Sequence, residues 1–585
     1  MLSSRHLSAL LPARIREAVR SRESGLVLAA LCIGTASGCI VVAMSGIVQL
    51  MHSLFFGLDL SERLSAADAV EWWRALLVPA LGGLCLGVIS ISVVARLRVR
   101  FADAIEANAL YGGKLSFRAS LVIAVQTIVS SGFGASVGLE AGYTQMCAAI
   151  ASWTGQRLAA RRADLRMLVA AGAAGAIGAA FDAPLAGAFY GFEVVLGTYA
   201  VSSLVPVAAS ALMATLVANE LTGHISLLSP RIIGSIEGNK FVHTAAIGVI
   251  CAGISIAVME GVALAETVFT HPRLKTVLRP AAGGLVVGAL ALVTPQVLGA
   301  GHGAMQMDIV ISRPIATIAA LLVLKCLSSA ISLGSGFRGG LFFASLLIGA
   351  LAGRLYADLS AQIDPIWAID AGAAAITGMA ALGTGVLGAP VTMTVLALET
   401  TSEISITVAA LIASTISSLI VREAFGYSFA TWRFHLRGEV IRGPHDVGWI
   451  QELTVGRMMR TDVATAPAEL SIGEMRSRFP LGATKQVALL KPDQTYAGLV
   501  LTADLYATEN DINKSVSALA CHAEAYLLPE MNIQRALDAF RRSEADALIV
   551  ADSTISPRVM GLVSEAHALR RYGEELEKRN QEFIA

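Results

Sequence analysis

The sequence predicts a mainly α-helical polytopic membrane protein that ends in a small α/β unit, and three observations support this. Of its 585 residues, 55% are hydrophobic and only 15% are charged, against about 25% charged in an ordinary soluble domain. Apolar stretches recur between Ser24 and Glu423, several of them about 20 residues long, enough to cross a ~30 Å lipid core as helix. From about Phe429 onward the chain becomes charged and its apolar runs shorten.

The N-terminal segment indicates how the chain is oriented in the lipid bilayer. Residues 1–25 carry five arginines and no apolar core followed by a small-residue cleavage site, so they do not resemble a secretory signal peptide. Arginines just before a first span favour the cytoplasmic side. We therefore expect a multi-pass protein of a bacterial inner or plasma membrane, with cytoplasmic N- and C-termini. An organelle transit peptide, also rich in Arg and Ser, is the alternative.

Composition argues against several classes of function. Lys plus Arg equals Asp plus Glu at 44 each, and no basic cluster is interleaved with aromatic residues, so no nucleic acid partner is expected. The spans carry no metal-ligand spacing and no nucleophile motif. We therefore expect no metal site, no required cofactor and no enzymatic activity. His302, in GAGHGAM, is expected to face water from a loop.

Two patterns occur twice in the membrane part. The segments FDAPLAGAFYGFE (181–193) and VLGAPVTMTVLALE (386–399) each place an Ala-Pro pair nine residues before a Glu, counted from the Pro. A glycine-rich break precedes each segment, SSGFGASVGLEAG in the first and SLGSGFRGGLFFAS in the second. A break, a helix and an Ala-Pro helix, occurring twice, predict an inverted internal repeat of broken and tilted helices.

The glycine breaks favour an anion as the transported ion. An interrupted helix is tolerated in a membrane only where its free N–H groups face protein or water. Those groups lie at the positive end of the helix dipole. Helices that begin within Leu139–Gly142 and Gly340–Phe343 would therefore offer two anion-binding ends without a basic side chain. A cation path, such as that of a magnesium transporter, would need several acids facing a pore.

Glu140 is the one acid in the first break. An intramembrane acid is costly and usually functional. At the positive end of a broken helix its carboxylate can occupy the anion site as a tethered competitor, and protonation or displacement would free that site. The alternative is a structural carboxylate that caps its helix or pairs with a distant arginine.

Four segments, taken in order, resemble the CLC family of chloride channels and proton-coupled chloride transporters. They are GLEAGYTQ, AGAAGAIGAAFDAPLAGAFYGFE, GGLFFAS and GMAALGTGVLGAPVTMTVLALETT. The resemblance implies a homodimer in which each subunit has its own pore. It also implies that chloride or another small anion, with protons in the exchangers, is transported.

The resemblance assigns roles to individual residues. The family's gating glutamate lies in Gly-Arg-Glu-Gly-Pro, and GLEAG places Glu140 there. The family's second break reads Gly-x-Phe-x-Pro, with Ala344 at the proline position here, and its backbone amides hold the anion. A pore tyrosine begins the last membrane helix. The implied anion-binding residues are Leu139, Glu140, Ala141, Leu341, Phe342, Phe343 and Tyr427.

The sequence departs from the family at two places. A Gly-Ser-Gly-Ile-Pro motif, whose serine coordinates the anion, should precede IEANAL, but this chain has VRFADA there, with Arg100 and Asp103. The identity of the anion therefore stays open. In the proton-coupled members an inner glutamate directly follows the acid after the Ala-Pro helix, whereas Val194 follows Glu193 here. We expect a voltage- or pH-gated chloride channel. A proton-coupled exchanger is the alternative, because water can carry protons to Glu140.

The charged region repeats itself between Leu453 and Tyr572. Each copy has a lead, a turn with Pro, an amphipathic helix, a β-branched strand, a strand containing GLV and a closing helix. This order resembles a tandem pair of CBS domains, which often hold adenine nucleotides. The resemblance implies ribose contacts from Thr502 and Asp504, with Glu565 and His567 at the equivalent places of the second copy. A packing module without a ligand is the alternative.

These observations divide the chain into segments. We expect a basic N-terminus (1–23), a transmembrane domain (24–428) with halves 24–225 and 240–428, a linker (429–452), two CBS domains (453–510 and 515–575) and a charged tail (576–585).

Overall fold

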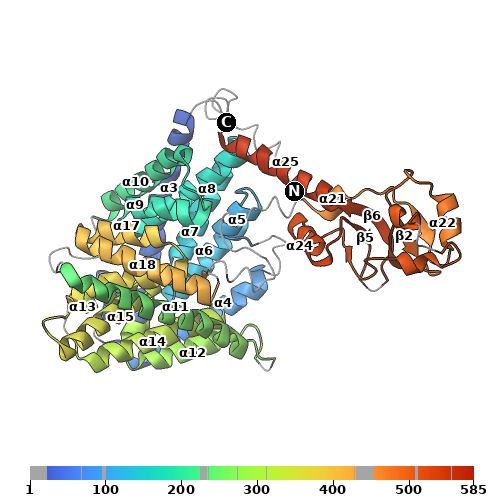
Figure 1. Ribbon diagram of the computed structural model, residues 1–585. Helices are drawn as coiled ribbons and strands as arrows, with labels where there is room; N and C mark the ends of the chain where they lie inside the picture. Colours follow the sequence, from blue (N-terminus) through green and yellow to red (C-terminus); the bar gives the residue numbers. More distant parts are fainter. Residues whose placement is uncertain are drawn as a thin grey trace. The chain divides into compact units, whose positions relative to one another are not determined.

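A computed structural model describes most of the chain. The described residues are 23–67, 69–94, 101–223, 234, 236–272, 274–310, 313–426, 428–429, 432, 453–507, 511–554 and 556–584. The chain forms two compact units, residues 1–446 and 447–585. Figure 1 draws the first unit in blue to orange helices and the second in orange to red helices and strands.

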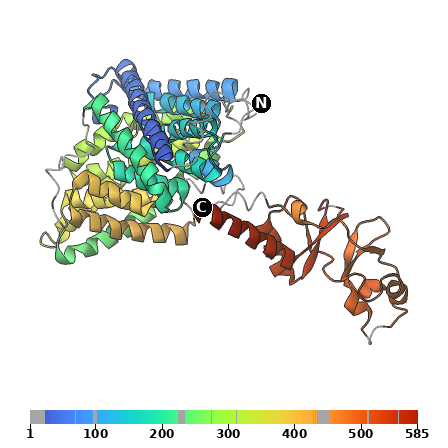
Figure 2. The same cartoon turned by 90° about the horizontal axis from the view of Figure 1, so that it is seen from above.

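The first unit is helical, as predicted, and its helices cross at many different angles (Figure 2). In the described part of the chain, eight helices are long and apolar enough to cross a membrane. Four further apolar helices have only 10–17 residues, as expected for a fold with broken helices. The first half contains α3 (Glu23–Phe56), η2 (Leu64–Ala66), α4 (Trp72–Ile89), η3 (Ser90–Val94), α5 (Ala104–Leu110), α6 (Phe117–Gly132), α7 (Glu140–Arg157), α8 (Arg162–Phe181), α9 (Pro184–Tyr190), η4 (Gly191–Leu196) and α10 (Val201–Thr222).

The second half repeats this order. It contains η6 (Gly238–Lys240), α11 (Phe241–Phe269), α12 (Arg279–Ala291), η7 (Pro295–Val297), α13 (His302–Val310), α14 (Ile315–Ser335), α15 (Phe342–Ile363), α16 (Ala371–Leu387), α17 (Pro390–Thr401) and α18 (Ile404–Ala424). Helix α8 packs on α3, α7 and α10, and α16 packs on the matching set α11, α15 and α18.

The Ala-Pro pairs begin helices in both halves for the same local reason. Pro184 and Pro390 are the first residues of α9 and α17, where the fixed φ and missing N–H of proline cost nothing. The preceding helices end in left-handed residues, Asp182 (φ 52°) after α8 and Gly388 (φ 75°) after α16. The two copies therefore share their backbone conformation as well as their sequence.

Close backbone contact between α15 and α16 depends on glycines. A Cβ built on Gly349 or Gly353 of α15 would overlap backbone carbonyls of α16, those of Gly378 and Ala374. A Cβ on Gly378 would in turn meet the Gly349 carbonyl. Small residues four apart allow this approach, which gives packing where no hydrophobic effect drives helices together.

The second unit contains two three-stranded sheets of identical topology. In each, the first strand pairs parallel to the second and the second pairs antiparallel to the third. Both antiparallel pairs carry an irregularity at the same place, after Leu489 and after Val550. The elements are α21 (Val455–Met458), β1 (Thr465–Pro467), α22 (Ile472–Arg478), β2 (Gln486–Leu490), β3 (Tyr496–Leu501), α23 (Thr502–Leu505), η8 (Val516–Leu519), β4 (Tyr526–Leu527), α24 (Ile533–Ser543), β5 (Ala547–Ala551), β6 (Val559–Ser564) and α25 (Glu565–Ile584).

The two copies exchange their lead segments. Val455, which opens the first copy in sequence, donates its N–H to the Met531 carbonyl at 2.8 Å and lies in the core of the second copy. Val516, which opens the second copy, donates to the Leu470 carbonyl at 2.9 Å and lies in the core of the first. Each copy therefore completes the core of the other, and the pair forms one unit.

We predict that Gly378→Leu destabilises the first unit, because the new side chain meets the α15 backbone. Overpacking of this kind costs about 1–3 kcal/mol. Thermal unfolding in detergent should show a lower midpoint for this variant. Gly253→Leu is the control, because nothing lies within 4 Å of a Cβ at that position of α11. Equal midpoints for the two variants would contradict the close contact.

Candidate anion-binding site

The glycine breaks of the two halves pair with each other. Gly138 donates its N–H to the Gly340 carbonyl at 2.9 Å, and Gly340 donates to the Gly138 carbonyl at 3.1 Å, which makes an antiparallel bridge. A two-fold axis between copies of one segment makes the copies antiparallel. The bridge therefore places the local axis of the inverted repeat at the two breaks.

Two helix N-termini begin at this bridge. Helix α7 starts at Glu140 after the N-cap Leu139, and α15 starts at Phe342 after the N-cap Leu341. Neither N-cap side chain accepts a hydrogen bond from its helix. The predicted backbone groups are thus present at both helix starts, and Leu139, Leu341, Phe342 and Phe343 are all buried while Ala141 is half-buried.

The Glu140 carboxylate lies where these helix ends meet. It is 3% exposed and accepts hydrogen bonds from the N–H of Phe343 and from its own N–H. Its Oε2 atom has no partner among the described residues. A Cβ on Gly138 would overlap this oxygen. The absence of a side chain at Gly138 therefore leaves the space that the carboxylate occupies.

Aromatic rings enclose the α15 side of the site. Phe181, at the end of α8, lies 4.7 Å from Phe342 and 5.8 Å from Phe343, between ring centroids. The His302 ring stacks on Phe343 at 3.6 Å. The expectation of a loop histidine facing water is wrong, because His302 is the first residue of α13 and lies against this wall.

Tyr190 is a site residue that the sequence did not single out. It comes from α9, is 8% exposed, and its ring centroid lies 6.0 Å from that of Phe342. Its hydroxyl forms a side-chain hydrogen bond with Thr144 and experiences the charges of Glu140 and Asp103. The signal in sequence was a tyrosine within the Ala-Pro helix, which reads equally well as apolar packing.

Tyr427, of the predicted site, and Arg100, near the place of the missing serine motif, lie outside the described residues. Asp103, close to the place of the missing serine motif, caps α5 by accepting the Glu106 N–H at 2.7 Å. Tyr427 stays a prediction.

The two acids of the Ala-Pro segments cap each other's helices. Glu193 accepts the N–H groups of Val391 and Thr392 at 3.2 and 2.8 Å, at the start of α17. Glu399 accepts those of Leu185 and Ala186 at 2.7 and 2.8 Å, at the start of α9. Carboxylates satisfy free N–H groups and the helix dipole there, so this exchange ties the two halves together.

The predicted nucleotide contacts lie at the start of α23. Thr502 is 3% exposed and its Oγ1 has no partner among the described residues, whereas Asp504 is exposed. An unpaired buried hydroxyl in a predicted nucleotide site is compatible with a ligand, but adenine nucleotide binding stays a prediction.

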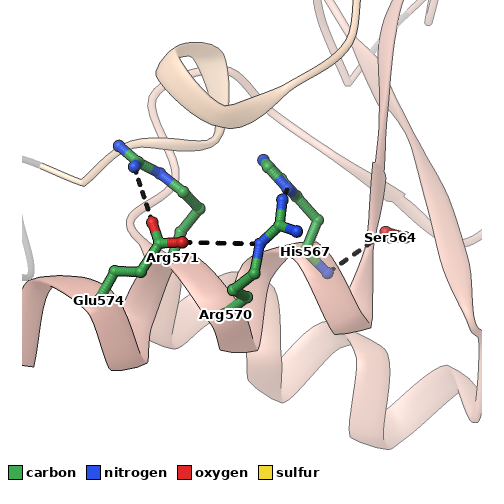
Figure 3. Close-up of polar contacts among 5 residues, drawn as sticks. All are labelled: Ser564, His567, Arg570, Arg571 and Glu574. Carbon is green, nitrogen blue, oxygen red and sulfur yellow. Dashed lines mark hydrogen bonds and ion pairs between the residues drawn. The ribbon is translucent and has the colours of Figure 1, made fainter.

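The equivalent place in the second copy is basic (Figure 3). The Arg570 guanidinium lies 3.2 Å from Nδ1 of His567, and Arg571 donates to Glu574 at 3.0 Å. Burial, and then the charges of Arg570, Arg571 and Arg460, lower the pKa of His567. His567 therefore stands where the first copy has the Asp504 carboxylate, and the two copies are not equivalent in chemistry.

The fold and the site together define an anion-transport protein of two inverted halves. The family model described as voltage gated chloride channel matches residues 82–422. The voltage-gated ClC-type chloride channel ClcB of Salmonella typhimurium is 30% identical over 407 residues, which cover 68% of this chain and 95% of that protein. The ClcB protein of Escherichia coli O157:H7 is 29% identical over 406 residues, with the same coverage. The chain therefore belongs to the CLC family.

Solved structures agree with this fold. A slow cyanobacterial Cl−/H+ antiporter superposes with a TM-score of 0.61 at 20% identity, covering 70% of this chain and 97% of that one. A eukaryotic CLC transporter gives a TM-score of 0.59 at 17% identity and covers 93% of this chain and 97% of that one. The second match extends over both units, as expected for a transmembrane domain followed by a CBS pair.

We predict that Glu140→Gln, which mimics the protonated acid, raises anion conductance and removes its dependence on outer pH. The amide carries no charge, so it competes less with an anion for the helix N-termini. Currents in planar bilayers at several outer pH values measure this. Glu260→Gln, on an exposed face of α11, is the control. Unchanged pH dependence in Glu140→Gln would remove Glu140 from the gate.

Proposed function

We propose that the protein is a chloride-channel-type pore for a small anion, gated by Glu140. One observation carries this proposal: a buried carboxylate, itself an anion, accepts hydrogen bonds at the start of α7 and α15. Helix N-termini are ready-made anion sites. A permeant anion of similar size can take the same N–H groups once the carboxylate leaves.

Gating is then a competition between the Glu140 carboxylate and a permeant anion for one binding site. This site consists of the N–H groups at the start of α7 and α15, and we call it the seat. Protonation of Glu140 removes its charge and weakens its hold on the Phe343 N–H, and a permeant anion replaces it. The seat consists of backbone groups. The replacement of the family's flanking Gly, Arg and Pro residues therefore leaves it intact, and Ala344 in the second break does so as well.

We propose that the Tyr190 hydroxyl takes over the role of the missing serine. It lies against Phe342 and within range of the charges of Glu140 and Asp103, and can turn its O–H from Thr144 to an anion at the start of α15. The hydroxyl donates to whichever halide-sized anion fits beside it. The Tyr190 hydroxyl would therefore contribute to anion selectivity, and the sequence left the identity of the anion open.

Tyr190→Phe is predicted to weaken anion binding while the protein stays folded. One hydrogen bond to a charged group is worth roughly 1.5–3 kcal/mol, so affinity for chloride should fall at least tenfold in calorimetric titration. The control is Tyr356→Phe, which removes a hydrogen bond to His243 at a different place in the fold. Equal affinities in Tyr190→Phe and the unsubstituted protein would place Tyr190 outside the pore.

The residues at the inner acid positions, Glu193 and Val194, favour passive anion flux over proton-coupled exchange. An exchanger needs a titratable group between Glu140 and the cytoplasm, because a buried acid can relay protons. Glu193 is held as a cap of α17, and the next residue, Val194, is 6% exposed and cannot titrate. Among the described residues of this segment no free acid stands in the relay position.

The solved relatives favour the alternative. Their titles name a Cl−/H+ antiporter and, at 16% identity, a fluoride/proton antiporter. For this chain we retain proton-coupled exchange of chloride or another anion as the second candidate. The homodimer and the cytoplasmic termini expected from the sequence belong to the same proposal.

Proton coupling can be tested in liposomes. We predict anion flux without uphill proton movement when a chloride gradient is imposed, voltage is clamped by an ionophore and internal pH is recorded with a dye. Protein-free liposomes and liposomes with a proton ionophore are the controls. Uphill proton movement driven by the anion gradient would make the protein an exchanger with an unrecognised proton route.

A further inference from the structure

Four basic side chains gather beside the candidate gate. They come from separate elements: His52 from α3, Arg63 from the segment before η2, His302 from the start of α13 and Lys325 from α14. His302 experiences the charges of Arg63, Lys325 and His52, and His52 experiences that of Arg63. We call these four residues the basic cluster.

The fold holds the cluster in place through backbone contacts. The Ser65 hydroxyl accepts the N–H groups of Gly303 and Ala304 at 3.0 and 3.2 Å, which fastens η2 to the start of α13. Lys325 is 2% exposed and donates Nζ to the carbonyls of Val297 and Gly299 at 3.2 and 2.7 Å. The Arg63 and His302 side chains are therefore carried on anchored segments.

The cluster borders the site that Glu140 occupies. His302 stacks on Phe343, whose N–H binds the Glu140 carboxylate. Tyr143, three residues after Glu140, experiences the charges of both Glu140 and Arg63. Gly299, whose carbonyl accepts a hydrogen bond from Lys325, donates its own N–H to the carbonyl of Gly134 in the first break at 3.1 Å. The basic cluster and the gate therefore form neighbouring parts of one region.

The described residues provide no acid to balance this charge. Lys325 is bound to carbonyls alone, and no carboxylate within the described ranges forms an ion pair with Arg63, His302 or Lys325. Burying an uncompensated charge is expensive, and a buried charge is normally paired. An anion drawn from solution would supply the missing partner.

We propose that the basic cluster is a second anion-binding site, distinct from the seat at the helix N-termini. It takes a small monovalent anion between Arg63 and His302 and passes it to the seat when Glu140 leaves. Since Arg63 follows the end of α3, whose start adjoins the arginine-rich N-terminus, the site lies on the predicted outer side. This inference rests on the proposed function for its role in transport, but its binding can be tested separately.

Arg63→Gln is the informative variant, because Arg63 is half-buried and forms no ion pair with any described residue. The concentration of outer chloride that gives half-maximal current should rise about tenfold, as expected for loss of one charge-assisted contact, while the dependence on inner chloride stays the same. Arg63→Lys should recover part of the loss. Arg74→Gln is the matched control, since Arg74 lies in the first turn of α4, just after the same connection, but pairs with Glu71 at 2.8 Å.

A diffuse surface potential gives a different result from a local site. The currents are therefore repeated at about 1 M ionic strength with an impermeant salt, where the Debye length is about 3 Å. A shift in Arg63→Gln that persists there, with no shift in Arg74→Gln, supports the site. A shift that disappears at high salt, or an equal shift in both variants, overturns it.

Binding without transport separates this inference from the proposed function. In calorimetric titration with bromide, the unsubstituted protein should bind an anion that Arg63→Gln binds about tenfold more weakly. If the protein carries no anion current but keeps this Arg63-dependent binding, the proposed function fails and the site stands. If current is present and neither binding nor current depends on Arg63, the site fails and the proposed function stands.

Discussion

The meeting of two helix N-termini at Gly138 and Gly340 is the constraint on which the rest of the membrane unit depends. Each half supplies one broken helix, and the antiparallel bridge brings their free N–H groups to one point. An isolated break would leave those groups unsatisfied in lipid, which costs several kcal/mol per group. Each half therefore depends on the other to shield its free N–H groups. The electrostatic potential where the two helix N-termini meet is positive because of those N–H groups and not because of a basic side chain.

The same logic of exchanged partners recurs elsewhere in the chain. Glu193 and Glu399 cap helices of the opposite half, and in the second unit Val455 and Val516 complete each other's cores. In each case a group needed by one copy is supplied by the other. This exchange links the copies to each other.

Charge in the membrane unit is distributed to suit an anion. The acids of the Ala-Pro segments accept hydrogen bonds from helix N-termini, whereas Arg63 and Lys325 have no acidic partner in the described part of the chain. In our proposal, the Tyr190 hydroxyl, beside Phe342, takes over the role of the serine that the family motif would supply. The site thus differs from the family pattern in its side chains but retains the backbone arrangement that the pattern serves.

The sequence by itself determined the architecture and placed Glu140 at the break between helices, where we propose the gate. Glycine breaks, Ala-Pro pairs and a lone Glu140 are local signals, because each reflects a backbone conformation or a desolvation cost that a few neighbouring residues reveal. It did not reveal Tyr190, His302 or the basic cluster. Their roles depend on contacts between residues more than 40 positions apart, such as Tyr190 with Thr144 and His302 with Phe343. Only the tertiary structure decided those, since a tyrosine in an apolar helix and a histidine after a glycine look the same in sequence whether they face a pore, lipid or water.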